Sequence, residues 1–177
     1  QILQTTVDAY RKLRNTVRYL LGALAGFNEA ERLSDYGQMP PLERFILHRL
    51  HELDAQVREA YRTYRFQDVV RPVLEFCSND LSALYFDIRK DSLYCDAADS
   101  HRRRSARTVL DVLHRCLCAW LAPVLVFTAE EAWLARFPDE NDSIHLHDFP
   151  VLPGEWQDEA LAERWATLRA RRAEATG

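Results

Sequence analysis

The stretch SHRRRSARTVLDVLHRCLCAWLAP, residues 100–123, predicts one long helix that is buried along most of its length. Ser100 suits its start, because a serine side chain accepts a hydrogen bond from the free amides of a first helical turn. Pro123 must kink or end the helix, since proline has no amide hydrogen to donate. The apolar face between them repeats at spacings of three and four residues and contains Ala106, Val109, Leu110, Leu113, Leu117 and Trp120. Such a helix needs other apolar helices around it.

Three segments toward the N-terminus carry the same spacing and supply those partners. The first can end at Gly26 and has as inward residues Leu3, Tyr10, Leu13, Val17, Leu20 and Leu24. The second follows a loop over residues 35–41 and carries Ile46, Leu50, Leu53, Val57, Ala60 and Tyr64. The third spans residues 67–89, has Pro72 in its first turns, and carries Val70, Val73, Leu74, Cys77, Leu81, Leu84, Tyr85 and Ile88. A short connection over residues 91–99 then leads to Ser100.

The C-terminal part changes character. Thr128 to Glu131 has the spacing of a capping box, which predicts a short helix ending near Phe137. Residues 143–149 alternate imperfectly and predict an extended segment, and residues 157–172 predict a last helix with Leu161, Trp165 and Leu168 on one side. The expected fold is all-α: an antiparallel four-helix-type bundle over residues 1–137, with an extended segment and a C-terminal helix over residues 138–177.

Composition limits the possible functions. The chain has 177 residues, 47% of them hydrophobic, which is enough for a core without disulfides or a metal. Its net charge of -4 excludes a uniformly basic nucleic-acid binder, so local clusters must carry any such role. The four cysteines lack a C-x-x-C pair, and we find neither a signal peptide nor an apolar run of membrane-spanning length. We expect a cytoplasmic protein, and the start within a helical pattern without methionine predicts a piece of a longer one.

The first helix carries a basic stripe. Arg11, Arg14 and Arg18 stand at positions i, i+3 and i+7, which places them on one face, and Asn15 lies beside them. Three guanidinium groups and an amide suit contact with phosphates and base edges. A solvated basic face paired with acidic neighbours is the alternative, and the sequence leaves both open.

A second cluster lies where the third helix ends and the fourth begins. It combines charged and aromatic residues, as expected for a surface that binds splayed bases, and contains Tyr85, Lys90, Tyr94, Arg102, Arg103 and Arg104. Cations at a helix start oppose the helix dipole, so the arginines need a partner. That partner is either Asp87 or Asp91, or an external anion.

Other reactive residue types have simpler interpretations. His145, His147 and Asp148 lack further ligands at a suitable spacing, so we interpret the histidines as exposed residues rather than a metal site. The capping pattern explains Glu130 and Glu131 better than acid–base chemistry does. No glycine-rich phosphate loop and no nucleophile elbow occurs. We therefore expect no active site, no metal and no cofactor in this chain.

Three phrases of the sequence are specific enough to indicate a family. They are YRKLRNTVRYLLG at residues 10–22, a stretch over residues 64–110 that contains LSALYFDIRKDSLY at residues 81–94, and WLAPVLVFTAEEAW at residues 120–133. In these phrases, and in their order, the chain resembles the anticodon-binding region of class I aminoacyl-tRNA synthetases. The second phrase is most similar to the isoleucyl members, and bacterial ones in particular.

The resemblance implies a domain that reads tRNA while the chemistry lies elsewhere. The HIGH and KMSKS signatures that bind ATP in this family are missing, as are the editing domain and the C-terminal zinc module of some bacterial members. It implies isoleucine tRNA as partner, missing catalytic and editing domains of the same chain, ATP and Mg²⁺ in that catalytic domain, and a monomeric parent protein. Two alternatives stay open: a helical scaffold that docks other protein domains, or the same domain of a valyl, leucyl or methionyl enzyme.

The resemblance also implies contact residues. In related methionyl enzymes an arginine in the first bundle helix and an aromatic residue just after the third contact the anticodon, and these positions are similar to Arg14 and to residues 90–94 here. Residues that share a helix face with Arg14, and Arg102 at the start of the fourth helix, are added as further candidate contacts. The complete candidate set is Arg11, Arg14, Asn15, Arg18, Lys90, Asp91, Ser92, Tyr94 and Arg102.

Overall fold

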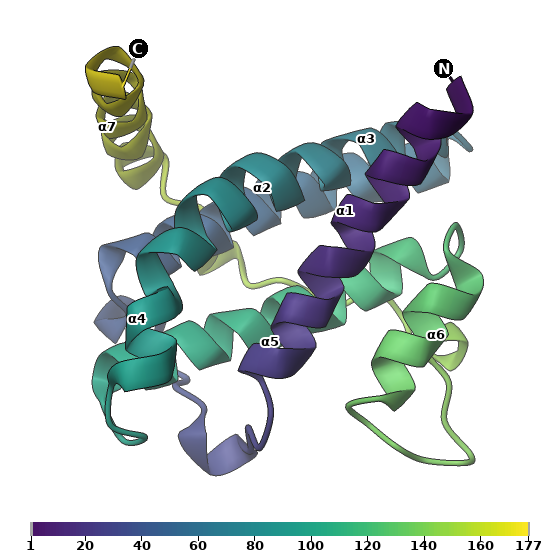
Figure 1. The fold of residues 1–177 in the computed structure, drawn as a ribbon, viewed down its shortest axis with the longest axis horizontal. Helices are drawn as coiled ribbons and strands as arrows, with labels where there is room; N and C mark the ends of the chain where they lie inside the picture. The colour runs from purple at the N-terminus through teal and green to yellow at the C-terminus, as the bar shows by residue number, and fades with distance from the viewer. Residues whose placement is uncertain (1, 177) are drawn as a thin grey trace.

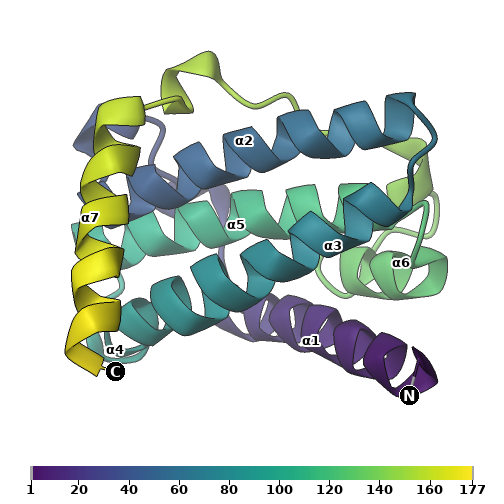
Figure 2. The same ribbon diagram turned by 90° about the horizontal axis from the view of Figure 1, so that it is seen from above.

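Four helical segments form the body of the protein in our computed structural model, which describes residues 2–176 apart from the side chains of residues 2, 172, 173, 175 and 176 (Figure 1). In chain order they are α1 (Ile2–Ala23), α2 (Pro41–Arg62), the continuous run α3 (Gln67–Glu75), η3 (Phe76–Phe86) and α4 (Asp87–Cys95), and α5 (His101–Leu121). Figure 2 shows that α1 and the α3–α4 run point one way while α2 and α5 point the other. The predicted antiparallel all-α bundle is confirmed.

The helix α5 is the centre of the core. Ser100 caps it as predicted, with its hydroxyl oxygen accepting a hydrogen bond from the Arg103 amide at 3.2 Å. Its apolar face is buried as the spacing predicts, and the fully buried residues include Val109, Leu110, Leu113, Leu117 and Trp120. The helix ends at Leu121, two residues before Pro123.

Helices α1 and α2 bury most of the predicted stripes. Leu13, Val17 and Leu20 lie in the core, but Leu3 is 82% exposed, so the stripe does not extend to the first turn. The start of α1 lies at one end of the bundle, at the upper right of Figure 1. Tyr64 is also exposed, because the chain leaves α2 there with a φ of 57°.

The third helical segment is longer than predicted. Residues 91–95 belong to α4 instead of forming a connection, because buried Leu93 anchors this last stretch against the bundle. Its middle part, η3, is a π-helix, in which hydrogen bonds run from i to i+5. Ile88, predicted inward, is exposed, whereas Tyr85 lies inside the core and donates a hydrogen bond to Glu43 at 3.2 Å. Tyr85 is therefore excluded from the surface cluster at this corner.

The short helix α6 (Val126–Leu134) has Leu125 at its N-cap position and no side-chain cap, so the predicted capping box is wrong. Thr128 and Glu130 have tertiary partners instead. The Thr128 hydroxyl lies 3.1 Å from the Tyr10 hydroxyl, and the Glu130 carboxylate accepts hydrogen bonds from the Ser143 hydroxyl and the Ile144 amide. Both contacts bind α6 to distant segments, which a local pattern cannot reveal.

The last part of the chain lies on the bundle. Residues 143–149 contain a turn of 3₁₀-helix rather than an extended segment, and α7 (Glu159–Thr176) crosses near the start of α2 (Figure 2). Trp165 stacks on Phe45 with ring centroids 5.1 Å apart, and the guanidinium of Arg169 lies 2.5 Å from Asp80. Leu168, predicted inward, is half exposed. The 3₁₀ turns are η1 (Glu29–Glu31), η2 (Tyr36–Gln38), η4 (Ile144–Leu146) and η5 (Gly154–Trp156).

Candidate nucleic-acid interface

The polar stripe of α1 is exposed as predicted, but two of its cations have partners. Arg14 donates a hydrogen bond to the Tyr10 hydroxyl at 3.0 Å and lies 3.6 Å from Glu131 of α6. Arg11 lies 3.7 Å from Asp8, one turn earlier. Arg18 and Asn15 make no hydrogen bond or ion pair with any described group. The alternative of a basic face paired with acidic neighbours thus holds for Arg11 and Arg14 but not for Arg18.

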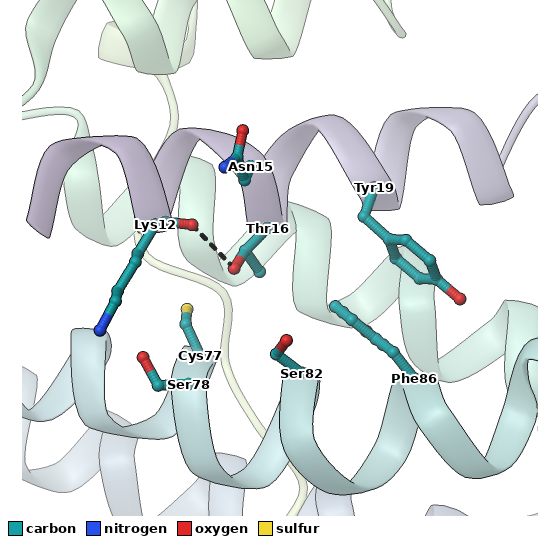
Figure 3. A pocket seen from close by; sticks show the side chains of 8 residues that line it. All are labelled: Lys12, Asn15, Thr16, Tyr19, Cys77, Ser78, Ser82 and Phe86. Carbon is teal, nitrogen blue, oxygen red and sulfur yellow. Dashed lines mark hydrogen bonds between the residues drawn. The ribbon is translucent and has the colours of Figure 1, made fainter. Parts of the chain in front are cut away.

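A groove of about 350 Å³ separates α1 from the π-helix η3. In Figure 3 Lys12, Thr16 and Tyr19 of α1 point toward the side chains of η3, whereas Asn15 lies at the rim and points away from η3. Its base contains the buried side chains of Thr16 and Cys77, and burial raises the pKa of the Cys77 thiol to about 12, so the thiol stays protonated. The polar residues around the groove are Lys12, Asn15, Ser78 and Ser82.

An aromatic pair closes one end of this groove. Tyr19 of α1 stacks on Phe86 with ring centroids 4.1 Å apart, and Lys12 lies toward the opposite end (Figure 3). Burial raises the pKa of Tyr19 to about 12, and the nearby Tyr94 adds to the shift. The ring of Tyr94 is 73% exposed. Tyr94 therefore lies near Tyr19, with its ring open to solvent, although it does not line the groove.

The candidates on α4 have different surroundings. The ammonium of Lys90 lies 3.0 Å from Asp87, and this hydrogen bond raises the pKa of Lys90. Asp91 is exposed, whereas Ser92 is buried against the bundle and offers no surface to a ligand. Among these residues of α4, Tyr94 lies near α1 and is exposed, whereas Ser92 is buried and cannot contact a ligand.

The arginine triplet is held by partners that the sequence did not predict. Arg102 makes two hydrogen bonds to Asp96, at 2.9 and 3.0 Å, instead of reaching Asp87 or Asp91. Arg103 donates to the carbonyl oxygen of Leu93, and Arg104 donates to two carbonyl oxygens of η1. The triplet thus connects α5 to the end of α4 and to the first loop, which explains its place without an external anion.

Several residues around the groove were missing from the predicted set. They are Lys12, Tyr19, Ser78, Ser82 and Phe86. Lys12 and Tyr19 stand seven residues apart on one face of α1, a signal that the sequence does contain. The alignment of Ser78, Ser82 and Phe86 depends on the π-helix, which no sequence pattern indicated.

Other candidate chemistry has structural explanations. The ring nitrogen Nε2 of His147 lies 2.6 Å from Asp142, and His145 is exposed. Within residues 2–176 no three His, Cys, Asp or Glu side chains cluster in a way that would hold a metal ion. No helix in this described range has both the length and the apolar character needed to cross a membrane.

The comparisons with known proteins agree with this architecture. Residues 43–175 match the family model of the anticodon-binding domain of tRNA ligases, and the chain belongs to this family. An isoleucine–tRNA ligase of Caulobacter vibrioides is 58% identical over 99% of this chain, and one of Gluconobacter oxydans is 56% identical over 97%. A third, from Bartonella henselae, is 51% identical over 100% of the chain. The chain spans only 18% of the length of each of these relatives.

Proposed function

We propose that this domain binds the anticodon loop of isoleucine tRNA as part of an isoleucine–tRNA ligase. Family membership carries the proposal, together with the isoleucine–tRNA ligase relatives that match nearly the whole chain. The ligase would join isoleucine to the tRNA in a catalytic domain outside this chain, with ATP and Mg²⁺ bound there. This domain then positions the tRNA and contributes to its selection.

The surface of α1 beside the groove is the part suited to RNA. Lys12 and Arg18 are exposed and have no carboxylate partner among the described residues, so they can neutralise phosphates without breaking an ion pair. Tyr94 offers an exposed ring for stacking on an unpaired base. Cations and aromatic rings together suit a single-stranded loop, in which phosphates and splayed bases are both accessible.

The remaining candidates have supporting roles in this proposal. Arg11 and Arg14 can exchange their ion pairs for phosphate contacts, because solvent-exposed ion pairs contribute little to stability. Lys90 and Asp91 flank Tyr94, and Arg102 lies at the same corner. We further propose that the parent protein acts in the cytoplasm as a monomer, with any zinc module beyond this chain.

The test compares tRNAs on the full-length ligase. Binding of isoleucine tRNA is measured against a variant with a swapped anticodon, and against valine, leucine and methionine tRNAs. We expect the swap to weaken binding at least tenfold, and binding to fall steeply as salt rises. Equal affinity for the original and swapped anticodons would contradict the proposal, and tighter binding of a sister tRNA would reassign its specificity.

A second function, docking of another protein domain, is favoured by one observation. Large apolar side chains are exposed where α1 and α6 begin, and Leu3 is 82% and Phe127 89% exposed. Val7 and Val126 in the same turns are partly exposed as well. Under this alternative, Phe127→Ser would weaken contact with the rest of the ligase and lower its thermal stability. The anticodon swap would then leave tRNA affinity unchanged.

A further inference from the structure

The groove between α1 and η3 contains polar groups that have no use in the domain itself. The side-chain amide of Asn15, the ammonium of Lys12 and the hydroxyls of Ser78 and Ser82 form no hydrogen bond or ion pair with any described group. Their neighbours Thr16 and Cys77 are buried at the base of the groove, and most of the exposed lining surface is apolar. A concave apolar site with a few converging polar groups is the usual form of a small-ligand site.

The π-helix η3 aligns the side chains on one side of this groove. Ser78, Ser82 and Phe86 stand four residues apart, and all three line the groove. In an α-helix this spacing drifts by about 40° at each step, because a turn takes 3.6 residues. The i to i+5 bonding of η3 widens the turn, so a step of four residues no longer overshoots a full turn. The three side chains therefore face α1 together (Figure 3).

The shape and chemistry of the groove fit a single nucleotide. Its volume of about 350 Å³ is near the lower end of the range for small-ligand sites, about 300–1,000 Å³. A primary amide and two hydroxyls both donate and accept hydrogen bonds, as recognition of the edge of a base requires. Lys12 supplies a positive charge for a phosphate, and the stacked Tyr19 and Phe86 supply an aromatic wall.

We propose that this groove is the subsite for one unstacked base of the tRNA anticodon loop. The base lies against the apolar surface next to the Tyr19–Phe86 pair, and its polar edge faces Ser78 and Ser82. Asn15 contacts the nucleotide at the rim, and the phosphate lies near Lys12. The inference rests on the proposed function, since the base comes from the same tRNA. Under this proposal the base is recognised between α1 and η3, and not at residues 90–94 of α4 as the sequence predicted.

The experiment uses the full-length ligase and isoleucine tRNA transcripts that each lack one base of the anticodon loop. With the unmodified protein, we expect removal of one base to weaken binding on the order of 10- to 100-fold, the loss expected for one stacked base. Ser82→Phe fills the groove and should weaken binding of intact tRNA by a similar factor. In Ser82→Phe, removal of the same base should weaken tRNA binding little further, because the filled groove and the missing base eliminate the same contact.

Ala83→Phe is the matched control. It places the same ring one residue further along η3, on an exposed side chain that does not line the groove, and should bind every transcript like the unmodified protein. Far-UV circular dichroism and thermal melts of both variants should match those of the unmodified protein, which shows that they fold. Asn15→Ala is a second test at an exposed position and should reduce the penalty of removing the same base.

Each other outcome has a distinct meaning. If the unmodified protein does not distinguish swapped anticodons, the proposed function fails. If it distinguishes them but Ser82→Phe and Asn15→Ala bind all transcripts normally, the groove holds no base and only this inference is overturned. If Ser82→Phe instead lowers isoleucine activation while tRNA binding persists, the groove seats another part of the ligase, which also overturns it.

Discussion

Tyr19 and Phe86 stack with ring centroids 4.1 Å apart and ring planes 22° from parallel, and this contact joins α1 to the end of the π-helix. The preceding residue, Tyr85, points the other way, into the core, where its hydroxyl contacts Glu43. Two consecutive aromatic residues thus serve two different surfaces of one helix. The stability of the bundle and the shape of the groove are coupled at this point.

Phe86→Ala should lower the free energy of unfolding by ~3 kcal/mol, because it removes a nearly buried ring at a helix contact. Phe86→Leu keeps most of the volume and should cost about 1 kcal/mol. Urea denaturation of this chain measures both changes. A double-mutant cycle with Tyr19→Leu should give a coupling of about 1 kcal/mol, whereas additive effects would show that the stack contributes nothing of its own.

The bundle could be predicted because its main signals are local. Ser100 and the apolar face of α5 lie within one segment of chain, and the structure reproduces both. The π-helix could not be predicted in this way, since no pattern in the sequence indicated a change to i to i+5 bonding. The prediction ended the third helix near Arg89 and missed that Leu93 anchors the extension.

The candidate site was predicted only where its signals are local in the sequence. The stripe of α1 follows from spacing alone, and Arg11, Arg14, Asn15 and Arg18 are indeed exposed on it. Ion-pair partners are set by tertiary contacts, so Arg102 pairs with Asp96 and not with the expected carboxylates. The groove needs two helices brought together, which no single segment of sequence specifies.

Arg89→Met should destabilise the fold by about 3–5 kcal/mol, because it leaves the carboxylate of Glu43 buried without a countercharge. Glu43 is completely buried, and Arg89 holds it with two hydrogen bonds of 2.6 and 2.7 Å. The double variant Glu43→Leu with Arg89→Met removes both charges and should be more stable than Arg89→Met alone. Denaturant titration checks this order, and a double variant less stable than Arg89→Met would contradict it.

Stability should fall between about pH 6.5 and pH 4 because of His114. This residue is fully buried, its Nε2 lies 3.2 Å from the Ala132 carbonyl oxygen, and burial lowers its pKa to about 4. The unfolded chain, with a pKa of about 6.5, binds a proton over this range while the folded chain does not. The contribution of His114 to the free energy of unfolding is complete above pH 6.5. It is lost as the pH falls toward 4, by ~3 kcal/mol at most.

His114→Gln is the control for that pH dependence. Glutamine keeps an amide that can donate to the Ala132 carbonyl, but it does not titrate. Thermal melts between pH 4 and pH 7 should therefore show a flatter profile for this variant. The same slope in both proteins would show that other groups cause the loss.

Arg14→Ala in the full-length ligase should raise the KM for isoleucine tRNA about tenfold, as expected for the loss of one charge-assisted hydrogen bond to RNA. Isoleucine activation should not change, because the variant alters an exposed face of α1 and no buried contact. Arg62→Ala is the matched control, since Arg62 is an exposed arginine that pairs with Glu59 at the end of α2. Aminoacylation kinetics with varied tRNA concentration measure both variants. If the Arg62 control raises the KM as much as Arg14→Ala does, general loss of positive charge is responsible, and Arg14 holds no specific place in the interface.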